Sequence, residues 1–319
     1  MEAPLTFEPL FQERVWGGCR LAELYGKPLP PDAVIGESWE IVDRPDAESI
    51  VDSGPLAGTP LGRLWRSPDR TALFGARSAG AGDRFPLLVK LLDCVQTLSV
   101  QVHPPPAVAA ELGGEPKTEM WLVLETSGHA HLLAGLRRGV TRERFEATLR
   151  EGGDVAALLH QLDVRPGDAM FLPSGRVHAI GAGNVIAEVQ QSSDTTYRVY
   201  DFGRPGLDGE PRRLHVDEAL RSIDFDDVEP SLVAPDGEAL VHAAPFEVDR
   251  LALTGPRPAA PPGECAIVCA IDAPVRCAGH VLPPARFAIV PASCDAPLEP
   301  AEREAAVLRV LLGDPRQDG

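Results

Sequence analysis

Polar and apolar residues alternate in the segment LSVQVHP, as they do in a half-buried β-strand. This alternation predicts that Ser99, Gln101 and His103 share one face of the strand, with apolar side chains on the other. Further along the chain, KTEMWLVLE opens another strand-like run with Glu119, and a Pro-Ser-Gly turn comes shortly before His178. Amide, imidazole and carboxylate ligands without a thiolate are typical of an open catalytic site for a divalent metal such as zinc.

The alternative is that the histidine of LSVQVHP is an ordinary strand residue that meets solvent or a backbone carbonyl. The surroundings of His178 favour the metal site, because their spacing resembles the second metal-binding motif of the cupin superfamily, in which a turn aims the histidine inward. The matching residues are Gly167, Pro173, Gly175 and His178. The first cupin motif is altered, since Gln101 replaces its first histidine and the glutamate is displaced to Glu119.

The elements that must position these residues are short strand-like runs between residues 85 and 202, separated by Gly, Pro, Ser and Asp. Their spacing predicts a β-sandwich or barrel. Helical spacing interrupts them near residue 60, from Thr141 and from His215, and a threonine stands at a capping position in the first two. A second set of strand-like runs follows a turn-rich stretch, so we expect a metal-bearing catalytic domain over residues 1–230 and a smaller β domain over 240–319.

Composition restricts the class of protein. With 319 residues, 44% of them hydrophobic and 24% charged, the chain is typical of a folded globular protein. Its formal net charge of −17 excludes binding to nucleic acid or to an anionic membrane surface through overall charge, so an anionic substrate would need a local basic pocket. The chain shows neither a signal peptide nor a long apolar segment, which predicts a cytoplasmic location. The cysteines are scattered, and Cys265 and Cys269 are expected in the core.

Six segments then resemble the type I phosphomannose isomerases, in particular the short bacterial form. They follow the family order across residues 13–204, about three fifths of the chain: ERVWGG, IGESWEI, LSVQVHP, KTEMW, PSGRVHAIGAG and EVQQSSDTTYRVYDFGR. The resemblance implies a mainly β fold, with a cupin-like sandwich or jelly-roll N-terminal domain, a few helices and a smaller cupin-like C-terminal domain. It also implies reversible conversion of mannose 6-phosphate into fructose 6-phosphate.

The resemblance further implies specific roles for the residues of the site. One Zn²⁺ per chain would be held by Gln101, His103, Glu119 and His178. Arg198 would act in catalysis, and Ser99, Lys90 and Lys117 would contact the substrate, with Glu188 and Asp194 lining the same pocket as candidate catalytic carboxylates.

An aldose–ketose isomerisation requires groups that stabilise negative charge on oxygen and a group that carries a proton, and the residues named above are of these types. A proton moves between C1 and C2 through an enediol, and a metal or a guanidinium such as Arg198 can stabilise the charge on oxygen. Lys90 and Lys117 offer charge to the phosphate. Glu188 and Asp194 are both candidates for the proton carrier. The alternatives are that Glu188 pairs with Arg198 and that Asp194 only forms a turn.

Two rival functions stay open at this point. A cupin dioxygenase would use iron and an apolar pocket, against which the basic residues argue. A non-catalytic sugar-phosphate-binding protein would keep the scaffold without turnover, although every proposed ligand is present. The oligomeric state is left open by the sequence.

Overall fold

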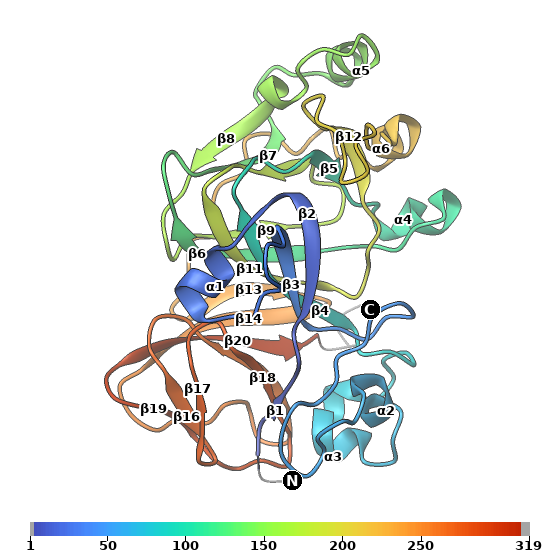
Figure 1. The fold of residues 1–319 in the computed structure, drawn as a ribbon. Helices are drawn as coiled ribbons and strands as arrows, with labels where there is room; N and C mark the ends of the chain where they lie inside the picture. The colour runs from blue at the N-terminus through green and yellow to red at the C-terminus, as the bar shows by residue number, and fades with distance from the viewer. Residues whose placement is uncertain (1–2, 314–319) are drawn as a thin grey trace. The chain divides into compact units, whose positions relative to one another are not determined.

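The computed structural model describes residues 3–313 and is mainly β, with short helices between the strands (Figure 1). The strand pairs with a defined residue register run antiparallel. The prediction of a mainly β fold with few helices is therefore confirmed.

Contacts divide the chain into two compact units. The first contains the chain up to Leu10, Ser38–Lys90 and the chain from Ala234 onward, and the second contains Phe11–Glu37 and Leu91–Val233. This division differs from the predicted domains 1–230 and 240–319, which stay a prediction. N-terminal residues group with the C-terminal region because β1 pairs with β18, with Leu5 opposite Ile289.

Two sheets have strands that belong wholly or partly to the second unit. The five-stranded sheet has the order β12 (Tyr197–Tyr200), β5 (Val100–Val102), β10 (His178–Ile180), β7 (His131–Leu136) and β8 (Leu159–Asp163). The six-stranded sheet has the order β2 (Leu10–Gly18), β3 (Ile35–Ile41), β4 (Leu87–Cys94), β11 (Asn184–Gln191), β6 (Glu119–Thr126) and β9 (Ala169–Leu172). The apolar face of β5 packs into a buried cluster with Val100 and Val102 fully enclosed.

The other two sheets belong to the first unit. The six-stranded sheet has the order β1 (Leu5–Thr6), β18 (Phe287–Val290), β15 (Ala266–Ala270), β20 (Ala305–Leu312), β14 (Phe246–Leu253) and β13 (Ala239–Ala243). The three-stranded sheet has the order β17 (His280–Leu282), β16 (Val275–Cys277) and β19 (Leu298–Pro300). Cys265 and Cys269 are buried, as predicted.

The helices are short. The α-helices are α1 (Arg20–Tyr25), α2 (Leu61–Trp65), α3 (Arg70–Phe74), α4 (Pro106–Ala109), α5 (Arg142–Arg150) and α6 (Val216–Ser222), and 3-10 turns span Ala76–Ser78, Ala110–Leu112 and Ala156–Leu158. Across residues 3–313, no helix has the length and apolar character needed to cross a membrane.

The predicted helix caps have different outcomes. Thr141 caps α5 as expected, because its hydroxyl accepts a hydrogen bond from the N–H of Arg144 at 3.3 Å. The threonine cap expected for the first helix is wrong, since α2 begins after Pro60 and has no side-chain cap. Proline already suits a helix start because its φ angle is fixed near the required value.

Candidate metal and active site

The register of three neighbouring strands brings polar side chains into one row. Gln101 on β5 lies opposite His178 on β10 and opposite Arg198 on β12. Directly opposed residues of antiparallel strands project to the same face, so these three side chains are neighbours. His103 follows Gln101 by two positions and continues the same face. The alternation expected for LSVQVHP thus becomes a polar row across three strands.

Glu119 comes from the other sheet of this unit. It is the first residue of β6 and lies opposite Gln190 on β11, while Trp121 lies opposite Glu188 in the next pair on the same face. The edge of the Trp121 ring approaches His178, with the ring centres 5.3 Å apart. Glu119 on β6, His178 on β10 and His103 directly after β5 therefore reach a common point from two different sheets.

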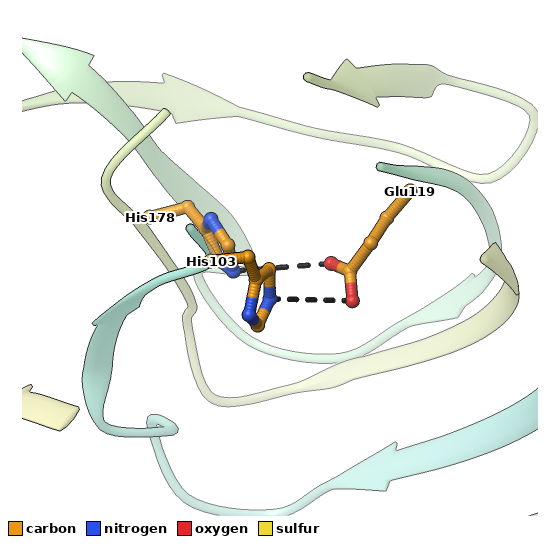
Figure 2. A group of neighbouring side chains, drawn as sticks. All are labelled: His103, Glu119 and His178. Carbon is orange, nitrogen blue, oxygen red and sulfur yellow. Dashed lines mark ion pairs between the residues drawn. The ribbon is translucent and has the colours of Figure 1, made fainter. Parts of the chain in front are cut away.

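The three side chains form one buried cluster (Figure 2). The Nε2 atom of His103 is 3.3 Å from Oε1 of Glu119, and the Nε2 atom of His178 is 3.8 Å from Oε2. Ligand atoms around a tetrahedral zinc ion lie roughly 3–4 Å apart, because each is about 2.0–2.2 Å from the metal. Glu119 and both histidines are at most 2% exposed, so the cluster is shielded from bulk water.

Each histidine is held by a backbone carbonyl on its other nitrogen. The Nδ1–H of His103 donates to the carbonyl of Thr195 at 2.8 Å, and the Nδ1–H of His178 donates to the carbonyl of Arg176 at 2.8 Å. A carbonyl oxygen only accepts, so the proton sits on Nδ1 and the lone pair of Nε2 faces Glu119. This is the tautomer that a metal-binding histidine needs.

The turn before His178 is tied to the strand that carries His103. Gly175 has φ +99°, a conformation that L side chains rarely adopt, and its N–H donates to the carbonyl of His103 at 2.9 Å. The hydroxyl of Ser174, in the same turn, accepts from the N–H of Lys117 at 3.0 Å. The Pro-Ser-Gly turn thus links the segments that carry the candidate ligands.

The charge states of the cluster suit a cation. Burial lowers the pKa of His178 to about 3, and burial together with the charge of Lys117 lowers the pKa of His103. Burial opposes ionisation of Glu119, but the nearby Lys117 ammonium and the two histidines together outweigh it and hold its pKa well below the usual range. Neutral imidazoles and an ionised carboxylate are the protonation states that bind a divalent metal.

The donor set fits a metal ion. Both carboxylate oxygens of Glu119 are buried and have no hydrogen-bond partner among the described residues. The Lys117 ammonium lies against Oε1, so Oε2, which faces Nε2 of His178 at 3.8 Å, is the oxygen that a bound metal ion would compensate. The side-chain amide of Gln101 lies 3.3 Å from Nε2 of His178, and rotation of the amide would present its oxygen as a further ligand.

Lys117 occupies an unexpected place beside this cluster. Its Nζ forms an ion pair with Oε1 of Glu119 at 2.6 Å and lies 3.5 Å from Nε2 of His103. Burial alone would lower the pKa of Lys117, but the carboxylates of Glu119 and Glu188 raise it. The ammonium thus supplies positive charge at the cluster itself, and a contact with the phosphate stays a prediction.

Arg198 lies at the end of the polar row and is partly buried. It donates through Nη1 to the carbonyl of Arg213 at 3.0 Å, and its buried Nε has no hydrogen-bond partner among the described residues. Burial and the positive charge of Arg212 lower its pKa. No ion pair found in the described part of the chain neutralises this guanidinium, which is the state expected of a group that contacts an anion.

The remaining predicted site residues have diverse surroundings. Glu188 is buried and accepts a hydrogen bond from Nε1–H of Trp121 at 2.8 Å. Asp194 is exposed on the loop between β11 and β12. Ser99 is buried just before β5. Lys90 belongs to the first unit, where its ammonium lies 5.2 Å from the centre of the Trp39 ring. The roles of all four stay predictions.

Some contributors escaped prediction from the sequence. The carbonyls of Thr195 and Arg176 orient the histidines. Every residue has a backbone carbonyl, so the residue type does not indicate which carbonyl takes this role. Trp121 anchors Glu188 and packs against His178. Trp121 follows Glu119 by two positions and therefore lies on the same face of the strand. This spacing is the one sequence signal that could have placed Trp121 near the cluster.

Comparison with known proteins agrees with this geometry. A family model described as phosphomannose isomerase type I, catalytic domain, matches residues 5–119. Mannose-6-phosphate isomerase ManA of Bacillus subtilis is 41% identical over 223 residues, which are 69% of this chain and 68% of that protein. A mannose-6-phosphate isomerase of Streptococcus mutans is 39% identical over 221 residues, covering 69% of this chain and 67% of the relative.

A solved structure agrees in fold as well. The crystal structure of the mannose 6-phosphate isomerase from Bacillus subtilis superposes with a TM-score of 0.82 at 28% identity, covering 97% of this chain and 99% of that one. The resemblance first carried by short motifs thus extends to most of the chain. On this basis the chain belongs to the type I phosphomannose isomerase family.

Proposed function

We propose that this protein interconverts mannose 6-phosphate and fructose 6-phosphate at a single zinc site formed by Gln101, His103, Glu119 and His178. One observation carries the proposal: the Nε2 atoms of His103 and His178 lie 3.3 Å and 3.8 Å from the two oxygens of the buried Glu119 carboxylate, which is the spacing of ligand atoms around one metal ion. The family and its relatives support the reaction, since the named proteins are mannose-6-phosphate isomerases.

The surrounding residues match the demands of the reaction. Moving a proton between C1 and C2 develops negative charge on the sugar oxygens, and groups already oriented toward that charge lower the barrier. A bound zinc ion supplies Lewis acidity there. Arg198 presents a planar guanidinium without a carboxylate partner, which can hold two oxygens at once.

Glu188 is the better placed of the two candidate proton carriers. It lies buried on the face that also carries Glu119, whereas Asp194 is exposed on a loop. A proton carrier for an enediol works best where water is excluded, because the intermediate is otherwise open to side reactions. The hydrogen bond from Trp121 fixes the carboxylate in one orientation. We therefore assign proton transfer to Glu188.

Phosphate recognition follows from the charge of the chain. A formal net charge of −17 repels a dianion, so binding requires local cations. Lys90, Lys117 and Arg198 are the proposed cations. The charge of Arg212 lowers the pKa of Arg198, but Arg212 and Arg204 are both paired with Asp201, so they are not counted among the phosphate-binding cations. Unphosphorylated mannose is accordingly expected to be a poor substrate.

A coupled assay for fructose 6-phosphate formed from mannose 6-phosphate tests the proposal. Activity should disappear after treatment with a chelator and return when zinc is added. Turnover that persists in fully chelated protein would refute the metal site, and absence of turnover in zinc-loaded protein would favour the non-catalytic binding protein. Iron as the only restoring metal would favour oxygenase-type chemistry.

A further inference from the structure

A second charged pocket lies within the first unit, in the region of Ser38–Lys90. It is a cavity of about 390 Å³, within the size range of sites that hold small ligands. Its charged lining residues are Asp43, Arg44, Glu48, Arg66, Asp83 and Arg84. None of them takes part in the cluster around Glu119.

The carboxylates of this pocket make their short bonds to backbone amides. The N–H of Phe85 donates to Oδ2 of Asp43 at 2.8 Å, and the N–H of Gly62 donates to Oε1 of Glu48 at 3.0 Å. A side chain at Gly62 would collide with both carboxylates, since an added Cβ would lie 2.6 Å from an oxygen of each. The close approach of α2 to the pocket therefore depends on this glycine.

The guanidinium groups, by contrast, are held loosely. Arg66 lies 3.8 Å from Asp43 and 3.9 Å from Glu48, and Arg84 lies 3.7 Å from Asp43. Other arginines of the same unit form close pairs, such as the 2.7 Å contact of Arg77 with Glu247. Arg66 does donate to the carbonyl of Asp83 at 3.1 Å. Most of the donors of these two half-exposed side chains thus remain available to a ligand.

We propose that this pocket is a second anion site, which binds a phosphorylated polyol through Arg66 and Arg84. Guanidinium forks match the geometry of a phosphate. A bare phosphate would also meet the accessible carboxylates of Glu48 and Asp83, so a fitting ligand has hydroxyl groups that donate to them. A divalent cation is a poor alternative, because within residues 3–313 potential metal-ligand atoms converge only at His103, Glu119 and His178.

The test uses full-length zinc-loaded protein and a hexitol phosphate that cannot be isomerised, glucitol 6-phosphate. Titration calorimetry should show two binding events for the wild type and one for the double variant R66Q/R84Q. Loss of charged hydrogen bonds should weaken the second event at least about tenfold. The Michaelis constant for mannose 6-phosphate should not change, because neither arginine belongs to the isomerase site.

A matched control lies on the same helix. Arg63 is exposed on α2 and does not line the pocket, so R63Q should bind the probe like the wild type. Equal weakening in R63Q would show a general charge effect and overturn the proposal. So would identical binding by R66Q/R84Q and wild type, or a parallel rise of the Michaelis constant, which would make the pocket part of the isomerase site.

Two further measurements keep the test informative. The conservative variant R66K/R84K retains charge without the fork and should bind the probe at an intermediate strength. Inorganic phosphate should bind more weakly than glucitol 6-phosphate, and equal affinity would overturn the assignment of a polyol. A melting temperature of unliganded R66Q/R84Q close to that of wild type shows that lost binding is not lost folding.

Discussion

Two rows of side chains, one in each unit, use the same strand geometry for opposite purposes. In the first unit, apolar residues face one another across five strands: Leu5, Ile289, Ile267, Val310 and Val248. In the second unit, Arg198, Gln101 and His178 stand side by side across three strands. The apolar row needs no partner beyond close packing, whereas the polar row is partly or fully buried and must be compensated.

The comparison shows how the buried polar groups of the second unit are compensated. Each buried histidine receives a backbone acceptor, and the carboxylate that faces them comes from a separate sheet. The Lys117 ammonium compensates one oxygen of Glu119, whereas the other oxygen and the buried Nε of Arg198 have no hydrogen-bond partner among the described residues. We therefore expect substitutions in the polar row to affect function and substitutions in the apolar row to affect stability.

The largest effect is expected from His178→Ala in the polar row. Loss of the metal removes several kcal/mol of charge stabilisation, so turnover should fall at least about a thousandfold. Metal analysis of the purified variant should show less than one zinc per chain. His129→Ala, at an exposed histidine outside the cluster, is the control. Full zinc content and full turnover in His178→Ala would show that His178 is not a metal ligand and that the polar row does not serve catalysis.

Glu188→Gln should follow, because a glutamine cannot carry the proton. Loss of a positioned acid–base group typically lowers turnover by at least about a hundredfold. Asp194→Asn, the exposed alternative, should stay within a few-fold of the wild type. Steady-state kinetics with equal zinc content in both variants decides between the two carboxylates, and the reverse pattern would assign the proton transfer to Asp194.

Arg198→Lys keeps the charge but loses the planar fork. If the guanidinium contacts charge developing on the enediol, turnover should fall about a hundredfold, the scale seen when one such donor is lost. Zinc content and melting temperature should change little, since Arg198 is not a proposed ligand. A rise in the Michaelis constant alone would make it a substrate clamp, and a loss of zinc would make it structural.

Ile267→Ala tests the apolar row. Truncation of this buried side chain should lower the free energy of unfolding by about 2–5 kcal/mol, because it leaves a cavity in a close-packed core. Turnover per folded molecule and zinc content should match the wild type. Urea denaturation followed by circular dichroism measures the change, and a selective loss of turnover without loss of stability would contradict the assigned role.

The smallest effect is expected from Asp201→Asn, close to the polar row. Burial alone would raise the pKa of Asp201, but hydrogen bonds from Arg212 and Arg204 outweigh it and lower the pKa. The ionised carboxylate therefore stabilises the fold above its unfolded pKa of about 3.9, and this stability is lost as the pH falls through the lower folded value.

Denaturation at several pH values measures this effect. Asp201→Asn should be less stable than the wild type at pH 7, and the gap should narrow below about pH 4. Asp46→Asn is the control, since the Asp46 side chain is 69% exposed. A gap that does not depend on pH would show that Asp201 acts through packing and not through its charge.

Much of the architecture could be predicted from local patterns. The runs containing β4, β5, β6, β7, β9, β11 and β12 were recognisable, as were those containing β14, β15, β18 and β20. The strands that were not predicted are β1, β2, β3, β8, β10, β13, β16, β17 and β19. Strand β10 has only three residues, and its sequence HAI carries too little alternation to be recognised without its partners. Short strands are defined by the neighbours that they pair with.

The sequence by itself determined the types of the candidate ligands and the face on which Gln101 and His103 lie, because alternation along a strand is a local property. Only the tertiary structure decided that Glu119 meets both histidines, and that Lys117 pairs with it. It also decided that the N-terminal strand joins the C-terminal sheet. These outcomes depend on pairing between residues far apart in the chain, which no local pattern encodes.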